Sequence, residues 1–265
     1  MEARVVRISV APVKSLGLVH PEEIEVGLHG VVGNRRLWIL DEDGRLFNNK
    51  RSGPMQLVRP EWDEASRTLA LTFPDGARVE GVVELGEPVD ATMYGEPLAS
   101  HRVVGPWQDA ISRFVGRDLT LLWADGHATD RGSRGGTVSL VSRGSLARLA
   151  EEGGAGEPVD GRRFRMLFEI DGVEPHEEDT WLGTQVQVGG ATLVLNGDVG
   201  RCVVTTQNPD TGETDFDTLG ALARYRREGV AEPLPFGVYG AVAVPGRVRV
   251  GDAVLPLARA VLAPT

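Results

Sequence analysis

Short runs in which hydrophobic and polar residues alternate dominate the chain, and this period of two is typical of β-strands with one buried face. The runs at 36–40 and 68–73 are each followed by a turn signal and a second apolar run, which predicts two hairpins. The glycine pair at 189–190 predicts a third tight hairpin. Further strands are expected at residues 4–10, 119–123, 137–142, 164–170, 184–188, 191–196, 201–206 and 247–250.

Helical spacing is found in only a few segments. Apolar residues recur three to four positions apart at 107–116, 142–152 and 217–228, which predicts three amphipathic helices. Many short strands with few helices predict a mainly β fold of the α+β class, organised as closed or nearly closed barrels. We expect a smaller N-terminal β-barrel-like domain at 1–95 and a main barrel at 105–258.

Composition excludes several kinds of protein. The chain has 265 residues, a formal net charge of −10 and a single cysteine. One cysteine cannot form an intramolecular disulfide, ligate an iron–sulfur cluster alone or build a Cys-rich zinc site. An acidic chain is a poor candidate for general nucleic-acid binding. No apolar run approaches the ~18 residues of a membrane span, and the N-terminus lacks a signal-peptide pattern, so a cytoplasmic location is expected.

Cys202 is the first candidate for chemistry, and it lies in an apolar, β-branched run. Its surroundings alone favour a small buried hydrophobic residue. The alternative is a thiolate that binds a soft metal or carries sulfur. The Asn-Pro-Asp-Thr-Gly stretch at 208–212 follows the expected strand, and a plain turn explains it adequately.

Basic residues gather at three separate places. Lys14 and Ser15 follow the first strand, Arg35 and Arg36 stand at the start of the strand at 36–40, and a group of arginines surrounds Phe164. In a strand at 164–170, the side chains of Arg163 and Arg165 would share one face. Each place alone is explained by a solvated turn or edge; together they could form a positive pocket for a small anion.

Two other motifs are weaker. His-Glu-Glu-Asp at 176–179 lacks the second histidine of a zinc-protease motif, and a solvated loop anchored by Trp181 is expected there. The Gly-rich stretch at 131–136 lacks the strand and helix that flank a dinucleotide-binding loop.

Several motifs together resemble the MOSC family, named for the molybdenum-cofactor sulfurase C-terminal domain, with its N-terminal β-barrel partner. They run over nearly the whole chain: PVKS, GNRRLW, GRCVVTTQNPDTGE, DTLGALARYR, PFGVYGAV and PGRVRVGDAV. The sequence is similar to the amidoxime-reducing components of this family. The resemblance implies a bound molybdenum cofactor, with Cys202 supplying a sulfur to the metal. It matches Lys14, Ser15, Arg36 and Arg165 to residues that bind the pterin or its phosphate.

The chain also departs from the family pattern. Met166 and Leu167 stand where relatives often carry Pro-Asn, and Gly135 and Gly136 stand where a Thr-Ser pair is expected. The amide and the hydroxyls that could hydrogen-bond the pterin are therefore replaced.

The resemblance implies an oxidoreductase that reduces N-hydroxylated or N-oxide small molecules. Electrons would come from a separate ferredoxin-like or flavoprotein-like donor, because the chain has no cysteines for a cluster of its own. Asp198 is a proton donor, a group that supports the residues around the metal, or a simple turn residue after Gly197. Two alternatives stay open: a sulfur carrier with a persulfide on Cys202, and a non-catalytic protein that binds or delivers the cofactor.

Overall fold

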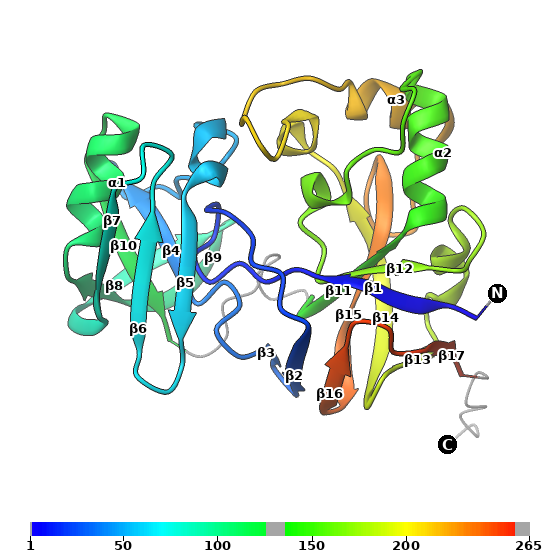
Figure 1. The fold of residues 1–265 in the computed structure, drawn as a ribbon, viewed down its shortest axis with the longest axis horizontal. Helices are drawn as coiled ribbons and strands as arrows, with labels where there is room; N and C mark the ends of the chain where they lie inside the picture. The colour runs from blue at the N-terminus through cyan, green and yellow to red at the C-terminus, as the bar shows by residue number, and fades with distance from the viewer. Residues whose placement is uncertain (1, 126–135, 258–265) are drawn as a thin grey trace.

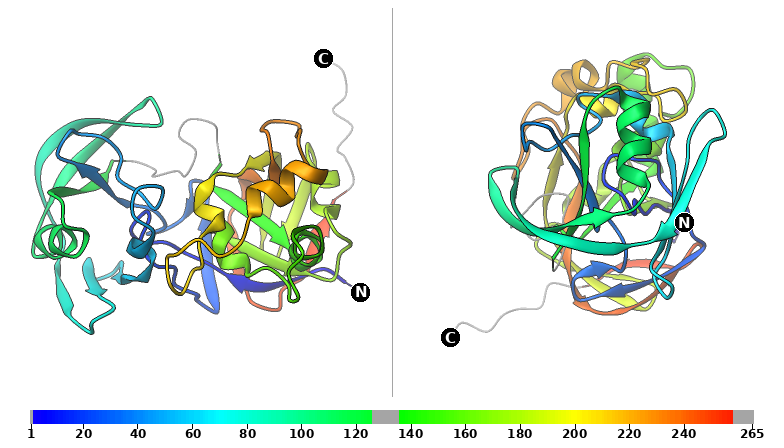
Figure 2. Two further views of the ribbon diagram at one scale, coloured as in Figure 1. Left: turned by 90° about the horizontal axis from the view of Figure 1, so that it is seen from above. Right: turned by 90° about the vertical axis from the view of Figure 1, so that its left-hand side faces the viewer.

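The chain folds into two lobes that lie side by side in the computed structural model, which describes residues 2–125 and 136–257 (Figures 1 and 2). The first lobe, residues 33–124, holds the strands from β4 to β10 and helix α1. The second lobe, residues 2–31 and 136–257, holds both ends of the described chain. Within the described ranges, no helix combines the length and hydropathy needed to cross a bilayer.

A nearly closed barrel forms the centre of the second lobe. Its seven strands run in the order β1 (Arg4–Ile8), β12 (Phe168–Asp171), β11 (Val138–Ser142), β15 (Pro235–Val244), β14 (Ala191–Gly200), β13 (Gln185–Val188) and β17 (Val254–Pro256). A bridge between Arg4 and Ala253 brings the two edge strands together. Only β11 and β12 pair in parallel; the other neighbours are antiparallel. A small sheet of β16 (Gly246–Arg249), β2 (Glu23–Gly27) and β3 (Gly30–Val31) adjoins the barrel.

Helices α2 (Arg143–Gly153) and α3 (Thr218–Tyr225) pack together at one end of this barrel. Ser142 and Asp217 cap them, each accepting a hydrogen bond from the backbone three residues on. Leu149 and Leu222 are fully buried in the cluster that the helices share with Phe236. The predicted helices at these positions are therefore confirmed, as is the mainly β fold class.

The first lobe contains two antiparallel sheets and one helix around a separate core. The strands are β4 (Leu37–Asp41), β10 (Leu119–Ala124), β9 (Glu96–Val104) and β8 (Glu84–Met93) in one sheet, and β5 (Arg59–Asp63), β6 (Thr68–Thr72) and β7 (Arg78–Val82) in the other. Helix α1 (Trp107–Val115) covers the sheets, and the buried Trp107 indole donates to the Leu69 carbonyl at 3.0 Å. Strand β10 extends this lobe to Ala124, while the predicted domain boundary near 95–105 stays a prediction.

One segment crosses from the second lobe into the first and returns. Residues 11–18 leave the barrel after β1 and place Val13 and Leu16 in the first lobe's core. The Lys14 amide donates to the Leu37 carbonyl at 2.7 Å, and the Gly17 amide donates to the Val58 carbonyl at 2.8 Å. The expected Lys14–Ser15 turn is thus presented from the first lobe.

The strand predicted at 164–170 is confirmed only over its last three residues, and the strand predicted at 201–206 is wrong. At 164–170 the chain forms η3 (Gly161–Phe164), then a left-handed Arg165, and only afterwards β12. At 201–206 it forms η5 (Val203–Thr206), because the hydroxyls of Thr205 and Thr206 donate to carbonyls three residues back. Arg163 and Arg165 therefore do not share a strand face. Strand β15, central in the barrel, is missing from the predicted strands.

The expected solvated loop at 176–179 is also wrong. These residues enter η4 (Glu177–Trp181), and the Glu178 side chain is completely buried. Its Oε1 accepts from the Ser145 hydroxyl at 2.7 Å and from the Ser142 amide at 3.1 Å. Burial raises the pKa of this carboxyl.

Candidate functional site

A cavity of about 470 Å³ lies between the two lobes and receives residues from both. The first lobe and the crossing segment contribute Lys14, Ser15, Arg35, Asn48, Asn49, Lys50, Tyr94 and Glu96. The second lobe contributes Arg163, Phe164, Arg165, Val199, Gly200, Arg201, Cys202, Val204, Thr205 and Glu232. The volume falls within the usual range of small-molecule sites.

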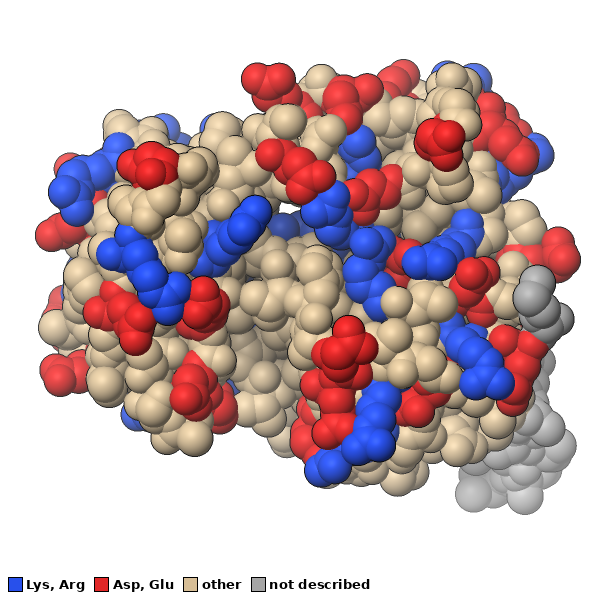
Figure 3. Space-filling view, in the orientation of Figure 1, with Lys and Arg blue, Asp and Glu red and all other residues tan. Residues whose placement is uncertain are grey.

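The cavity is positively charged although the protein is acidic. Six of its described lining residues are lysine or arginine, and two are glutamate, in a chain with net charge −10. Basic side chains are seen gathering along the hollow between the lobes (Figure 3). One of the six, Arg163, forms an ion pair with Asp215, and hydrogen bonding to it lowers the pKa of that carboxyl. Such a local excess of cations attracts small anions.

Unusual backbone conformations converge on the same cavity. Four of its non-glycine lining residues have positive φ: Ser15 at 77°, Arg35 at 51°, Tyr94 at 54° and Arg165 at 53°. A left-handed conformation costs a non-glycine residue roughly 1–2 kcal/mol. Strain of this kind persists where the surrounding structure imposes it, and it gathers at functional sites.

Arginine side chains brace the cavity wall through backbone carbonyls. Arg35 Nη2 donates to the carbonyl of Arg165 at 2.7 Å, and Arg165 Nη2 donates to the carbonyl of Leu16 at 2.7 Å. Arg201 Nε donates to the carbonyl of Phe236 at 2.8 Å, and its guanidinium lies 5.1 Å from the centre of the Phe164 ring. These contacts fix the wall across the lobes before any ligand arrives.

Cys202 is half-buried and lines the cavity between the end of β14 and η5. Its carbonyl accepts from the Thr205 amide at 3.0 Å and from the Thr205 hydroxyl at 2.9 Å, which fixes the backbone that carries the thiol. Lys14, Ser15 and Arg165 line the same cavity. The structure therefore brings four of the six proposed site residues together, although they are up to 188 positions apart in the chain.

Arg36 and Asp198 do not line the cavity. The Arg36 guanidinium lies 4.8 Å from the centre of the Trp123 ring, on the first lobe, and Arg35 lines the cavity in its place. Asp198 is buried in β14, where its carboxylate accepts backbone N–H bonds from Val230, Ala231 and Glu232. A carboxylate engaged in this way anchors a loop, and the role of Asp198 as a proton donor stays a prediction.

Several residues that line the cavity were not predicted from the sequence. Arg201 precedes Cys202 directly, so its place beside the thiol could have been inferred from adjacency. Asn49, Lys50 and Tyr94 carried no recognisable signal, because they reach the cavity through loops of the other lobe. Glu232 is held near it by the loop that Asp198 anchors.

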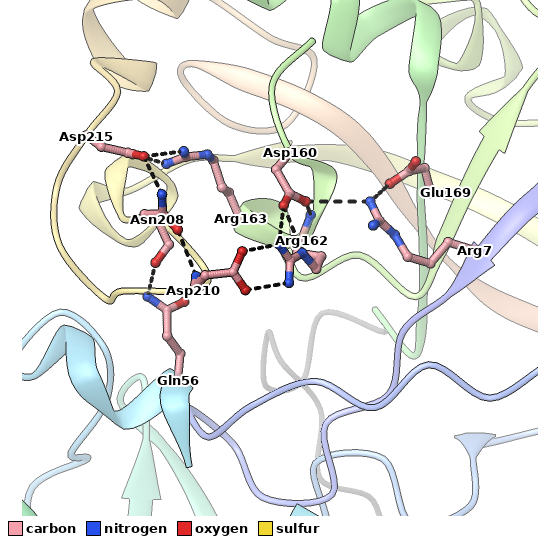
Figure 4. Close-up of polar contacts among 9 residues, drawn as sticks. All are labelled: Arg7, Gln56, Asp160, Arg162, Arg163, Glu169, Asn208, Asp210 and Asp215. Atoms are coloured by element: carbon pink, nitrogen blue, oxygen red, sulfur yellow. Dashed lines mark hydrogen bonds and ion pairs between the residues drawn. The ribbon is translucent and has the colours of Figure 1, made fainter. Parts of the chain in front are cut away.

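Arg162, the third arginine near Phe164, belongs to a network of ion pairs and hydrogen bonds beside the cavity. It pairs with Asp160 and Asp210, and Asp160 lies next to the Arg7–Glu169 pair (Figure 4). Its hydrogen bond lowers the pKa of Asp210. This network ties the turn at 208–212 to the barrel.

The positions that depart from the family pattern lie near one another. Gly136, Met166 and Leu167 line a small space of about 40 Å³ that shares Arg35 and Arg201 with the main cavity. Gly135 and the Gly-rich stretch up to that residue are outside the described residues. Within residues 2–125 and 136–257, no group of three or more His, Cys, Asp or Glu side chains is arranged to hold a metal ion.

Comparison with known families finds two matches that follow each other along the chain. Residues 2–116 match the MOSC N-terminal beta barrel domain, and residues 128–255 match the MOSC domain.

Known proteins with similar sequences fall into two groups. The chain is 24% identical to mitochondrial amidoxime-reducing component 1 of Xenopus laevis, over 96% of this chain and 82% of that protein. It is 33% identical to mitochondrial amidoxime reducing component 2 of Rattus norvegicus, over 44% of this chain and 36% of that protein. It is 25% identical to molybdenum cofactor sulfurase 2 of Culex quinquefasciatus, over 88% of this chain and 33% of that protein. The match thus spans about a third of the rat and Culex proteins.

Among solved structures, the YUAD protein from Bacillus subtilis aligns with a TM-score of 0.47 and 12% identity, over 96% of this chain and 94% of that one. The amidoxime-reducing relatives are named as mitochondrial, and the cytoplasmic location expected for this chain stays a prediction.

Proposed function

Because the chain belongs to the MOSC family, with a MOSC N-terminal β-barrel domain preceding the MOSC domain, we propose that it is a molybdenum-cofactor-dependent oxidoreductase. Its substrates are N-hydroxylated or N-oxide compounds, from which it removes oxygen. The names of the amidoxime-reducing relatives support this reaction class.

The residues of the cavity fit this cofactor. A thiol is a suitable ligand for a soft or high-valent metal, and Cys202 presents the chain's single thiol to the cavity. The basic side chains suit an anionic phosphate, since guanidinium groups bind phosphate through paired hydrogen bonds. Cys202 would hold the metal, Ser15 would hydrogen-bond the pterin phosphate, and Lys14, Arg35 and Arg165 would bind the phosphate and offset its charge. Arg35 takes the role that the sequence analysis assigned to Arg36.

When bound, the cofactor supplies the two-electron redox chemistry. The overall reaction consumes two electrons and two protons, breaks the N–O bond and releases the reduced nitrogen compound and water. The electrons come from a separate donor protein of the ferredoxin or flavoprotein class. The chain's own contribution is to orient the cofactor between the two lobes and to offset its negative charge.

The observation that carries the proposal is the placement of Cys202, Lys14, Ser15 and Arg165 on one cationic cavity. The test is molybdenum per chain in protein from a cofactor-competent host, beside Cys202→Ala and Cys202→Ser variants. We expect near-stoichiometric molybdenum in the wild type, altered Mo–S ligation in both variants, and reduction of an N-hydroxylated compound by a chemical donor in the wild type alone.

Two results would overturn the proposal. Folded wild-type protein without molybdenum or pterin, carrying sulfane sulfur on Cys202, would identify a sulfur carrier. Tightly bound cofactor with no turnover of N-hydroxylated or N-oxide compounds, under any donor, would identify a storage or delivery protein.

A further inference from the structure

A chain of buried amide side chains connects the Cys202 side of the cavity to the Lys14–Ser15 side. Asn49 Nδ2 donates to the carbonyl of Ser15 at 2.7 Å, and Gln207 Nε2 donates to the carbonyl of Asn49 at 2.8 Å. Asn49 and Gln207 are 3% and 8% exposed, so water competes little for these bonds. Gln207 ends η5, the turn that begins directly after Cys202.

The chain of bonds acts on a strained residue. Ser15 has a φ of 77° and is buried, and its carbonyl is the group that Asn49 holds. The bond from Asn49 thus helps to keep the Lys14–Ser15 turn in its left-handed conformation. Gln207 in turn ties the backbone of Asn49, on the first lobe, to η5 on the second.

A second amide crosses between the lobes without touching the cavity. Gln56 Nε2 donates to the carbonyl of Asn208 at 3.0 Å (Figure 4). Gln56 is 9% exposed and does not line the cavity. Gln56 and Gln207 are therefore chemically matched: each is a buried glutamine that donates one hydrogen bond to a backbone carbonyl of the opposite lobe.

We propose that Gln207 and Asn49 are positioning residues that fix where the Cys202 thiol lies relative to the cationic Lys14–Ser15 side of the cavity. This relative position is called the register below. They act through the backbone of Ser15 and η5 rather than through contact with the reacting atoms. The inference rests on the proposed function only for its meaning in cofactor binding; the register itself is a property of the free protein.

The register is measurable without cofactor, because Cys202 is the single thiol of the chain. Cations near the thiol accelerate alkylation by the anion iodoacetate relative to neutral iodoacetamide. The ratio of the two rates, normalised to a free thiol in solution, reports how the basic side chains are placed around Cys202. The variants are Gln207→Met, Asn49→Ala and, as matched control, Gln56→Met.

We expect the rate ratio to fall about threefold or more in Gln207→Met and Asn49→Ala, as for weakened charge interactions in a partly hydrated cavity. Gln56→Met keeps the wild-type ratio, although it too removes a hydrogen bond between the lobes. With cofactor, the dissociation constant rises roughly tenfold or more in the first two variants only, the scale of a lost hydrogen bond to a charged group.

Equal ratios in Gln207→Met and Gln56→Met would overturn the inference, whether both fall or both stay at the wild-type value. If both ratios fall, any weakening of the contact between the lobes is enough to displace the thiol. If both stay at the wild-type value, the amides do not set the position of the thiol. If Gln207→Met fails to fold, Asn49→Ala against Gln56→Met decides by the same criterion. Wild-type protein that binds no molybdenum cofactor would remove the proposed function and leave this test intact.

Discussion

His176 gives the stability of the second lobe a defined pH dependence. Its ring packs beside Tyr225 and Phe236, with ring centres 5.7 and 5.8 Å away, and both ring nitrogens are buried without a hydrogen-bond partner. Burial, reinforced by the charges of Arg226 and Arg148, lowers the pKa of His176 from 6.5 to about 4. The folded protein therefore holds this histidine neutral where the unfolded chain is already protonated.

The sign follows from proton binding. Below pH 6.5 the His176 side chain is protonated in the unfolded chain, whereas in the folded protein it becomes protonated only near pH 4. The free energy of unfolding therefore decreases as the pH falls from 6.5 to about 4. Between pH 7 and pH 5 the shift corresponds to about 2 kcal/mol at most. Because the residue is partly exposed, solvent screening reduces this to about 1–2 kcal/mol.

The perturbation is His176→Phe, which keeps an aromatic ring against Tyr225 and Phe236 and removes the titration. Its own effect on packing is the same at both pH values and cancels in the comparison. Urea unfolding at pH 7 and pH 5 should show a loss for the wild type that exceeds the loss for the variant by about 1–2 kcal/mol. NMR titration of the ring protons measures the pKa directly.

The reasoning fails if the variant loses as much stability between pH 7 and pH 5 as the wild type. It fails equally if the His176 ring titrates near 6.5 in the folded protein. His176→Asn is a second variant without a titrating ring, and asparagine tolerates the left-handed backbone found at this position.

The remaining predictions concern the cavity, the contact between the lobes, a surface turn and the loop that Asp198 anchors. Arg35→Gln should raise the cofactor dissociation constant roughly tenfold or more, whereas Arg36→Gln should change it little, as measured by titration of cofactor-free protein. Gly212→Ala should cost about 2 kcal/mol or more in urea unfolding, because its φ is 75° and a Cβ would lie 2.7 Å from the Gly53 carbonyl carbon. Gly44→Ala, with a φ of 72° and open space around it, should cost about 1 kcal/mol. Asp198→Ala should raise hydrogen exchange at least about tenfold in the loop it anchors.

Regular elements were predictable where one local signal dominates. The hairpin of β6 and β7 alternates clearly and has a Pro-Asp-Gly turn, and α3 follows a capping aspartate. The segments where the predicted strands fail, 164–167 and 201–206, by contrast both border the cavity. Their β-branched and aromatic residues favour strands, but Asp160 caps η3, and threonine hydroxyls bond the carbonyls in η5. The hydrophobic pattern fails at these two places because short-range hydrogen bonds from side chains to the backbone, which the pattern does not register, set the turns.

Some residues of the candidate site were predictable from the sequence and others were not. Cys202, Lys14, Ser15 and Arg165 were inferred from motifs, and the structure brings them to one cavity. Which of Arg35 and Arg36 lines the cavity could not be told from sequence, because Arg35 has a left-handed backbone conformation. No spacing rule reveals this turn. Likewise, the sequence leaves Asp198 open between a proton donor and a turn residue, and only its three backbone partners show that it anchors a loop.

The pairing of β1 has a consequence for the order in which the molecule folds. This strand pairs with β12, and Arg4 also bridges to Ala253, 249 positions further along the chain. The barrel of the second lobe therefore cannot close during synthesis until nearly all of the described chain has left the ribosome. The first lobe's strands and helix α1 end by Ala124 and can assemble much earlier. We expect refolding in two kinetic phases: a faster one for the first lobe, and a slower one limited by the closure of this long loop.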